Sequence, residues 1–356
     1  MRIIILFVLF VSNNTFSQQQ KFDSLFAAQK DFSGVVLIAE KGKPVYYKAF
    51  GYREFENQIP LQTSDIFELA SVSKQFTAMI IMMLKEKGML NYDDSVSRYL
   101  EIPYKGITIR HLLTHTSGLP DYQAVMDQYW DKTKVAGNPD CIEYLNKYAP
   151  PKHFEPGEKY EYSNTGYMLL ASIAEKASGK DFIELCRKWI FRKLKMKSTD
   201  IRTLEEKKAT NNFAIGHVYV VERDKYVRAD SFPSSNYTIW LGNRKGPGRI
   251  SSTATDLLKW DKALYTEKLI RQTTLQDAFT PMKLNNGSFS NYGFGWELRN
   301  DPLFGNIVQH SGDNPGYKTE IIRYVNKNKT IIVLNNNALS NFTDILRSLE
   351  AIIREY

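Results

Sequence analysis

Strand-like and helical patterns occupy different parts of this 356-residue chain, and that division constrains its fold more than any other feature. Near the N-terminus, Gly34–Glu40 and residues 45–52 are rich in apolar and β-branched residues and flank a turn at residues 41–44, which is typical of a β-hairpin. Toward the other end, period-two patterns predict strands over residues 292–298, 306–309, 318–325 and 330–334. The simplest arrangement is one antiparallel sheet built from both ends of the chain, with a helical domain inserted between them.

The segments between these strands have apolar residues at helical spacing. They cover residues 71–87, 108–115, 140–148, 163–176, 181–195 and 253–264. Two more amphipathic helices, over residues 22–28 and 342–353, are expected to cover the sheet, whereas residues 200–248 show no sustained period and are interpreted as long loops. These patterns predict an α+β fold. Its sheet part comprises residues 18–66 and 245–356, and its mostly helical part, an inserted all-α domain, comprises residues 67–244.

The first 17 residues are typical of a secretory signal peptide. Arg2 supplies a positive start, residues 3–11 are apolar, and small residues precede a cleavage site near Ser17. A buried N-terminal strand is the alternative. No later segment is long and apolar enough to span a bilayer, and no Cys follows the apolar run to carry a lipid anchor. We therefore expect residues 18–356 to be exported, as a periplasmic or secreted domain with no stable membrane span.

Charge and cysteine content restrict the partners and the covalent chemistry. The net charge of +8 is spread over the whole chain, and the basic stretch at residues 187–197 shares its helix with an apolar face, so we expect a solvated surface and no nucleic-acid partner. Cys141 and Cys186 are far enough apart in sequence for a stabilising disulfide. Both lie on apolar periodic segments, which favours two buried thiols, and their redox state stays open.

Ser71 and Lys74 form a Ser-x-x-Lys motif, which occurs once in the chain and lies at the start of a predicted helix. Residues three apart share a helix face, so the Lys74 amine can reach the Ser71 hydroxyl. A lysine kept neutral by burial can take the proton of a nucleophilic serine. The alternative is that Ser71 caps the helix and Lys74 is solvated.

A Tyr-x-Asn pattern occurs three times, beginning at Tyr144, Tyr162 and Tyr324. Tyr144 lies inside a predicted helix and Tyr324 ends a predicted strand, whereas Tyr162 ends a loop just before a helix. A loop tip on a rigid scaffold can present a catalytic side chain, so Tyr162 with Asn164 is the preferred candidate. In the alternative interpretation, Asn164 or Ser163 caps the helix and Tyr162 packs against the protein.

His310, Ser311 and Gly312 follow a predicted strand and form a third candidate motif. A glycine there lets substrate approach the backbone closely, and His310 can donate a hydrogen bond or exchange protons. An ordinary turn glycine beside a surface histidine is the alternative. A different pair, His111 and His115, has helical metal-ligand spacing but lacks the Glu that a zincin uses as base and a third ligand, so we expect no metal and no other cofactor.

In this order the three motifs resemble the set found in serine β-lactamases and penicillin-binding proteins, in particular the branch of class C β-lactamases, DD-peptidases and related esterases. Six stretches carry the resemblance: residues 67–77, 107–122, 154–170, 248–260, 292–296 and 310–317. It implies the β-lactamase-like version of the α+β fold, with the site in the cleft between sheet and helices.

The resemblance also implies a role for each site residue. Ser71 would be the acylated nucleophile, and Lys74 and Tyr162 would share general-base and general-acid duty. Asn164 would hold Lys74 or the substrate amide. The backbone N–H groups of Ser71 and Asp313 would form the oxyanion hole, and the substrate would bind along His310, Ser311 and Gly312.

Two departures from the family pattern bear on the substrate. Tyr162-Ser163-Asn164 replaces the Ser-Asp-Asn of class A enzymes, and His310 stands where most β-lactamases of the branch carry Lys. With an unperturbed pKa of about 6.5, His310 would be mostly neutral at pH 7.5, so carboxylate binding would be weak and would improve as the pH falls from 8 to 6. The nearby Lys318-Thr319 pair is followed by Glu rather than Gly and does not replace the motif.

These observations predict an exported serine hydrolase that cleaves an ester or amide, as an esterase or a D-amino-acid peptidase. A β-lactamase is the enzymatic alternative. A penicillin- or cell-wall-binding module that is acylated and then stalls is the second alternative. The expected partner is a small ester, β-lactam or D-amino-acid peptide, and the oligomeric state stays open.

Overall fold

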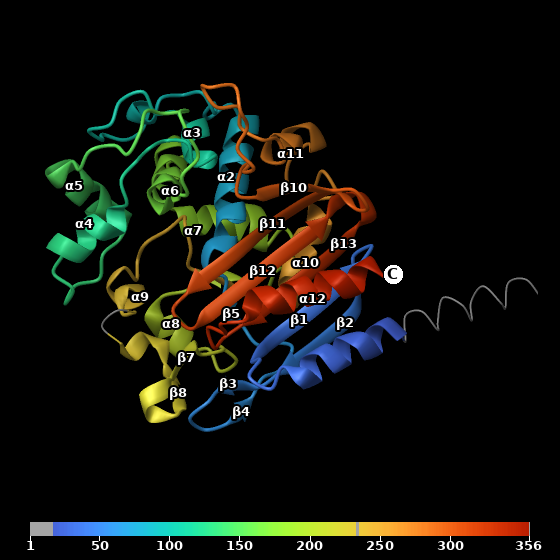
Figure 1. The fold of residues 1–356 in the computed structure, drawn as a ribbon. Helices are drawn as coiled ribbons and strands as arrows, with labels where there is room; N and C mark the ends of the chain where they lie inside the picture. The colour runs from blue at the N-terminus through green and yellow to red at the C-terminus, as the bar shows by residue number, and fades with distance from the viewer. Residues whose placement is uncertain (1–16, 233–234, 356) are drawn as a thin grey trace, which may run out of the picture.

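The computed structural model describes residues 17–232 and 235–355 of the chain. Six antiparallel strands form the main sheet in the order β10-β11-β12-β13-β1-β2 (Figure 1). Their bounds are Glu297–Asp301 for β10, Gly305–Asn314 for β11, Tyr317–Tyr324 for β12, Lys329–Asn335 for β13, Gly34–Glu40 for β1 and Lys43–Phe50 for β2. The two ends of the chain meet where β1 pairs with β13, from Gly34 opposite Asn335 to Glu40 opposite Lys329. The predicted sheet built from both chain ends is confirmed.

Both faces of this sheet are covered. Alternate residues of β1 enter different cores, with Leu37 in the core shared with the helical part and Ile38 in a second core. The second core lies beneath the helix over residues 17–28 and α12 (Phe342–Arg354), which lie across one face of the sheet in Figure 1. On the opposite face, α10 (Ala254–Ala263) contacts β1 and β13. The expected cover of terminal helices is thus present.

Helix α2 (Lys74–Glu86) is the centre of the helical part. Its residues from Lys74 through Leu84 are all buried, as expected for a helix surrounded by other elements. It contacts α6 (Asn164–Ser178), α11 (Gln272–Ala278) and the π-helix over Cys186–Phe191 that continues α7 (Phe182–Leu185). The helices α3 (Ile109–Leu113), α4 (Tyr122–Tyr129) and α5 (Asn138–Tyr148) pack against α6. Sequence-encoded caps fix α6: the Ser163 hydroxyl accepts from the Gly166 N–H, and Gly179 ends the helix with a φ of 67°.

Short elements connect the two parts. They are β3 (Tyr52–Glu54), β4 (Ile59–Pro60), β5 (Phe67–Glu68), β6 (Asp200–Ile201), α8 (Leu204–Lys208), β7 (His217–Val220), β8 (Lys225–Arg228), α9 (Tyr237–Trp240) and β9 (Ile250–Ser252). The prediction of long loops over residues 200–248 is therefore wrong where β7 and β8 pair as a hairpin. Each strand of this hairpin has only four residues, too few to produce a clear period in the sequence.

One predicted strand is misplaced. Over residues 292–298, aromatic residues alternate with glycines, but the strand β10 begins only at Glu297. Tyr292, Phe294 and Trp296 are instead buried, and Gly295 has a φ of 77°. A Cβ on Gly295 would lie 2.9 Å from the Gln75 Cα, so this glycine lets the segment pass against α2.

Three sequence-based expectations concern covalent and membrane features. Cys141 and Cys186 are both buried and unpaired, as the apolar periodicity favoured. The proposed signal peptide falls on residues 1–16, outside the described residues, and on Ser17. Within residues 17–232 and 235–355, no helix has the length and apolar character needed to cross a membrane.

Candidate active site

Ser71 lies in a tight turn between the sheet and α2. The turn is a 3-10 helix, Ala70–Ser73, and α2 begins directly after it at Lys74. Ala70 has a φ of 47°, a left-handed conformation that costs free energy for a residue with a side chain. Strained backbone immediately before a serine at a helix N-terminus is consistent with a functional site. The predicted helix thus starts at the expected place, with its first turn wound more tightly.

The Lys74 side chain lies at the centre of the site and contacts groups from three separate segments of the chain. Its side chain has no exposed surface. The Nζ atom lies 3.0 Å from the Ser71 Oγ, 2.9 Å from the Asn164 Oδ1 and 2.9 Å from the Pro247 carbonyl oxygen. A neutral amine has two N–H donors and one lone pair. Its donors match the oxygens of Asn164 and Pro247, and its contact with the Ser71 Oγ serves either as a third donor or, in the neutral amine, as the acceptor of the serine proton.

The surroundings of Lys74 favour the neutral amine. Burial lowers its pKa well below the usual value, and the positive charge of Arg244 lowers it further, while Asp121 opposes the shift. No carboxylate forms an ion pair with Lys74 among the described residues. A neutral lysine beside a serine hydroxyl can accept its proton.

Tyr162 is the predicted tyrosine that the structure brings to Lys74. The Lys74 Nζ lies 4.7 Å from the centre of the Tyr162 ring. Although 39% of Tyr162 is exposed, the protein atoms around its hydroxyl desolvate it and raise its pKa, an effect that hydrogen bonding with Ser71 opposes. The phenol therefore keeps its proton and is able to donate it.

The other two Tyr-x-Asn sequences lie elsewhere. Tyr144 is on α5, and its ring centre lies 5.3 Å from that of Trp130. Tyr324 is at the end of β12 and packs against Phe304. The choice of the Tyr162 loop by its position before a helix therefore selected the tyrosine that contacts Lys74.

His115 binds the loop that carries Tyr162 through hydrogen bonds to both neighbours of the tyrosine. Its sequence pattern did not indicate this function. The His115 Nδ1 accepts a hydrogen bond from the Ser163 N–H at 3.0 Å, and its carbonyl accepts one from the Glu161 N–H at 2.9 Å. Its ring is fully buried and its centre lies 4.4 Å from that of Tyr162. The loop is thereby fixed on both sides of Tyr162.

The metal-ligand spacing of His111 and His115 has a structural explanation. The His111 Nδ1 accepts from the Thr108 N–H at 3.2 Å and completes the cap of α3, whereas His115 contacts the Tyr162 loop. No group of three His, Cys, Asp or Glu side chains is placed to hold a metal ion among the residues that the structure describes.

Gly312 lies where β11 crosses the nucleophile turn. A Cβ at this position would lie 2.2 Å from the Thr319 Oγ1 and 2.3 Å from the Leu69 carbonyl oxygen. The Thr319 hydroxyl also donates to that same carbonyl at 2.9 Å. The close approach that requires glycine at position 312 is therefore made by the chain's own turn before Ser71, and the expectation that the glycine makes room for the substrate is corrected.

The residues around Gly312 alternate in exposure. His310 is buried, whereas Ser311 and Asp313 are exposed. The Asp313 carboxylate pairs with Lys318 at 2.8 Å. Beyond Gln309, β11 has no strand partner on the β10 side among the described residues, so residues 310–314 form a free edge beside Ser71.

His310 differs from the expectation. Its Nε2 lies 2.7 Å from the Tyr292 hydroxyl and its Nδ1 lies 2.6 Å from the Ser311 carbonyl oxygen, and only 1% of the residue is exposed. Burial lowers the pKa of His310 to about 3, and Lys74, whenever it is protonated, acts in the same direction. The expected titration of His310 between pH 8 and 6 is therefore wrong, because a neutral ring is maintained throughout that range.

Arg244 is a second residue that sequence reasoning missed. It is only 6% exposed, and its guanidinium donates to the Tyr122 hydroxyl at 2.6 Å, while its Nε has no hydrogen-bond partner. It lies in the loop that precedes β9 (Ile250–Ser252), and this loop supplies the Pro247 carbonyl to Lys74. Arg244 thus places a permanent positive charge beside the site.

Comparison with known proteins agrees with this geometry. The family model described as Beta-lactamase matches residues 20–351. The chain belongs to the Beta-lactamase family. It is 44% identical over 321 residues to Penicillin-binding protein 4* of Bacillus subtilis, an alignment that covers 89% of this chain and 71% of that protein.

Solved structures give the same family fold. A penicillin-binding protein from Bacillus halodurans matches with a TM-score of 0.80 and 25% identity, over 93% of this chain and 98% of that one. The D-amino acid amidase from Ochrobactrum anthropi matches with a TM-score of 0.77 over 96% of this chain and 99% of that one. At 23% identity, the amidase shows likeness of fold alone. The protein is a Beta-lactamase-family hydrolase with an antiparallel sheet and a helical part.

Proposed function

We propose that this chain is an exported serine hydrolase that cleaves esters or amides through an acyl-enzyme on Ser71. The observation that carries the proposal is the placement of Lys74, a fully buried lysine whose Nζ lies 3.0 Å from the Ser71 Oγ and is held by the Asn164 and Pro247 oxygens. The signal-like residues 1–17 support export to the periplasm or the medium.

In the acylation step, the Ser71 Oγ attacks the substrate carbonyl carbon and its proton passes to the Lys74 Nζ. The backbone N–H groups of Ser71 and Asp313 stabilise the oxyanion that forms. When the tetrahedral intermediate collapses, the bond to the leaving group breaks and Tyr162 donates a proton to that group, taking the Lys74 proton in return. The acyl group stays on Ser71 as an ester.

Deacylation repeats the same steps with water as the nucleophile. Water gives a proton to the Tyr162–Lys74 pair and attacks the ester carbonyl. When the bond between the acyl carbon and the Ser71 Oγ breaks, the pair returns that proton to the Oγ, which releases the acid and restores the Ser71 hydroxyl. Asn164 keeps the Lys74 amine in place through its side-chain oxygen. A positioned acid or base contributes about 10²–10⁴-fold to such steps.

His310 bears on the choice of substrate. A lysine at this position would present a permanent cation to a substrate carboxylate, whereas His310 is buried and neutral. We therefore propose that neutral short-chain esters or D-amino-acid derivatives are preferred over β-lactams, which carry a carboxylate.

A substrate panel tests this proposal. We expect p-nitrophenyl esters of short acids to be hydrolysed faster than nitrocefin, a D-Ala-D-Ala peptide to show whether amides are cleaved, and Ser71→Ala to abolish all turnover. Hydrolysis of nitrocefin above the best ester would favour a β-lactamase instead. Stoichiometric acylation without release would favour a penicillin-binding module that stalls.

A further inference from the structure

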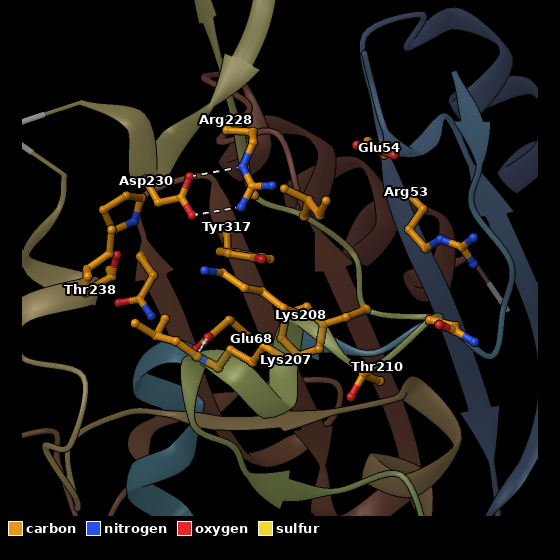
Figure 2. A pocket seen from close by; sticks show the side chains of 18 of the residues that line it. Arg53, Glu54, Glu68, Lys207, Lys208, Thr210, Arg228, Asp230, Thr238 and Tyr317 are labelled. Carbon is orange, nitrogen blue, oxygen red and sulfur yellow. Dashed lines mark hydrogen bonds and ion pairs between the residues drawn. The ribbon is translucent and has the colours of Figure 1, made fainter. Parts of the chain in front are cut away.

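The edge strand that carries the proposed oxyanion donor is open on one side. Residues 310–314 of β11 pair with β12, but beyond Gln309 they have no β10 partner within the described residues. Where β11 ends, Asn314 and Tyr317 line a cavity of about 390 Å³, and Figure 2 shows Tyr317 among the side chains around the hollow. Oxyanion donors are effective because they are in place before the charge develops. A further contact that fixes this edge would therefore affect the reaction rate.

The His310 ring makes such a contact through both of its nitrogens. Its Nδ1 lies 2.6 Å from the Ser311 carbonyl oxygen, and its Nε2 lies 2.7 Å from the Tyr292 hydroxyl. Burial lowers the pKa of His310, so the ring is neutral and has a single N–H. Because a carbonyl oxygen only accepts hydrogen bonds, this proton is on Nδ1. The Nε2 is then an acceptor, and the Tyr292 hydroxyl donates to it.

The Tyr292 side chain is itself fixed on the helical side of the site. Only 1% of the residue is exposed, and its ring centre lies 4.5 Å from that of His115 and 5.9 Å from that of Tyr160. The backbone that follows is held as well, because the Phe294 N–H donates to the Ala278 carbonyl oxygen at 3.1 Å. Ala278 ends α11, which contacts α2. The Tyr292 hydroxyl thus extends from a segment that is fixed against the helices.

Tyr292 and His310 together link the helical part to the oxyanion strand. Ser311, whose carbonyl accepts from the ring, lies two positions before Asp313, the proposed oxyanion donor. Both ring nitrogens are engaged in this link. This leaves His310 without a lone pair or an N–H for proton exchange with Tyr162, although the two ring centres lie only 6.2 Å apart.

We infer that Tyr292 is a positioning residue, which fixes the oxyanion strand through the His310 ring. Its hydroxyl selects the tautomer with a protonated Nδ1, and this tautomer holds the Ser311 carbonyl. The inference rests on the proposed acylation of Ser71 and adds to it a residue outside the three motifs. His310 accordingly connects Tyr292 to the strand and does not carry protons during the reaction.

Spectra that correlate ring protons with ring nitrogens, recorded on protein labelled with 15N-histidine, test the hydrogen bonds directly. The chain has five histidines, and His310→Ala identifies the His310 signals by their loss. We expect a protonated Nδ1 and an unprotonated Nε2 near neutral pH, and a protonated Nε2 would overturn the inference. Tyr292→Phe removes the donor and is expected to shift the Nε2 signal. An Nε2 signal that does not move would overturn the inference as well.

Ester hydrolysis tests the positioning. Tyr292→Phe is expected to lower kcat and kcat/KM for p-nitrophenyl acetate by the same factor, about tenfold, because the oxyanion is present in the transition state and not in the bound substrate. The factor is below the roughly 10²–10³ that loss of a whole oxyanion donor costs, since the donor remains and is only less well placed. In a His310→Ala background, Tyr292→Phe should cause no further loss, because the tyrosine acts through the ring. Additive losses would overturn the inference.

Controls separate this inference from the proposed function. Tyr104 is also a buried tyrosine, and its hydroxyl donates to the Pro150 carbonyl oxygen at 2.9 Å, so Tyr104→Phe is the matched control and is expected to leave kcat and KM unchanged. Thermal unfolding checks that each variant is folded, and the spectrum of the parent protein tests the tautomer even if Tyr292→Phe does not fold. Ser71-dependent hydrolysis that Tyr292→Phe leaves unchanged refutes the inference alone. Acetate hydrolysis that is equal in Ser71→Ala refutes the proposed function, and the positioning role with it.

Discussion

Replacing Gly312 with alanine tests whether β11 positions the nucleophile. The new Cβ would lie 2.3 Å from the Leu69 carbonyl oxygen, about 1 Å short of an ordinary contact, and this carbonyl belongs to the backbone directly before the Ser71 turn. The Thr319 side chain can rotate away, but the Leu69 carbonyl cannot move without the turn. A 1 Å misplacement of a reacting group costs about 10²-fold in rate, so we expect kcat/KM for a short ester to fall by about that factor.

The assay compares ester hydrolysis with the folded state. Gly312→Ala is expected to lose about 1–3 kcal/mol of stability through overpacking but to remain folded by circular dichroism. Gly137→Ala is the matched control, because its Cβ would meet its nearest neighbours at 3.5 Å and its φ is −118°. A folded Gly312→Ala enzyme with the activity of the parent would refute the argument that this glycine positions Ser71. A folded but slow variant whose activity returns with Thr319→Ala would place the conflict at the threonine instead.

Three further predictions concern proton transfer and charge. Lys74→Ala and Tyr162→Phe should each lower kcat/KM by about 10²–10⁴, whereas Tyr144→Phe should change it little; equal losses at the two tyrosines would contradict the assignment. Because the pKa of His310 is lowered to about 3, its ring stays neutral from pH 6 to 8, so the ratio of activities on carboxylate-bearing and neutral esters should not change with pH in that range; a ratio that titrates there and becomes flat in His310→Ala would refute this. Because the charge of Arg244 lowers the pKa of Lys74, Arg244→Gln should raise it and move the acidic limb of the kcat/KM profile to higher pH; an unmoved limb with an unchanged fold would show that Arg244 has no such effect.

Much of the fold follows from local patterns. Gly34–Glu40 is a strand with the predicted bounds because its apolar run is followed directly by a tight turn. Gly179 ends α6 where expected because only a residue that tolerates positive φ fits there. The prediction of a strand over residues 292–298 was wrong because its aromatic residues are buried in the core between glycines, and before β10 they form only one isolated bridge, between Tyr292 and Glu297.

The parts of the candidate site that depend only on nearby residues in the sequence could be predicted. The Ser71–Lys74 contact requires only a helix, and Tyr162 stood out because it precedes one. His115 and Arg244 were missed because their functions arise from contacts with segments far away in sequence, the Tyr162 loop for one and the surroundings of Lys74 for the other. The low pKa of His310 has the same origin, since burial beneath the sheet edge is a tertiary property.

The central claim is that Ser71 becomes covalently acylated, and labelling with a fluorophosphonate followed by mass spectrometry tests it most directly. The reagent reacts with an activated serine, so we expect one adduct per chain, mapped to the peptide that contains Ser71. Lys74→Ala should label much more slowly, and Ser71→Ala should not label. An adduct on a different serine, or an unmodified Ser71 in a folded protein after prolonged exposure, would contradict the account.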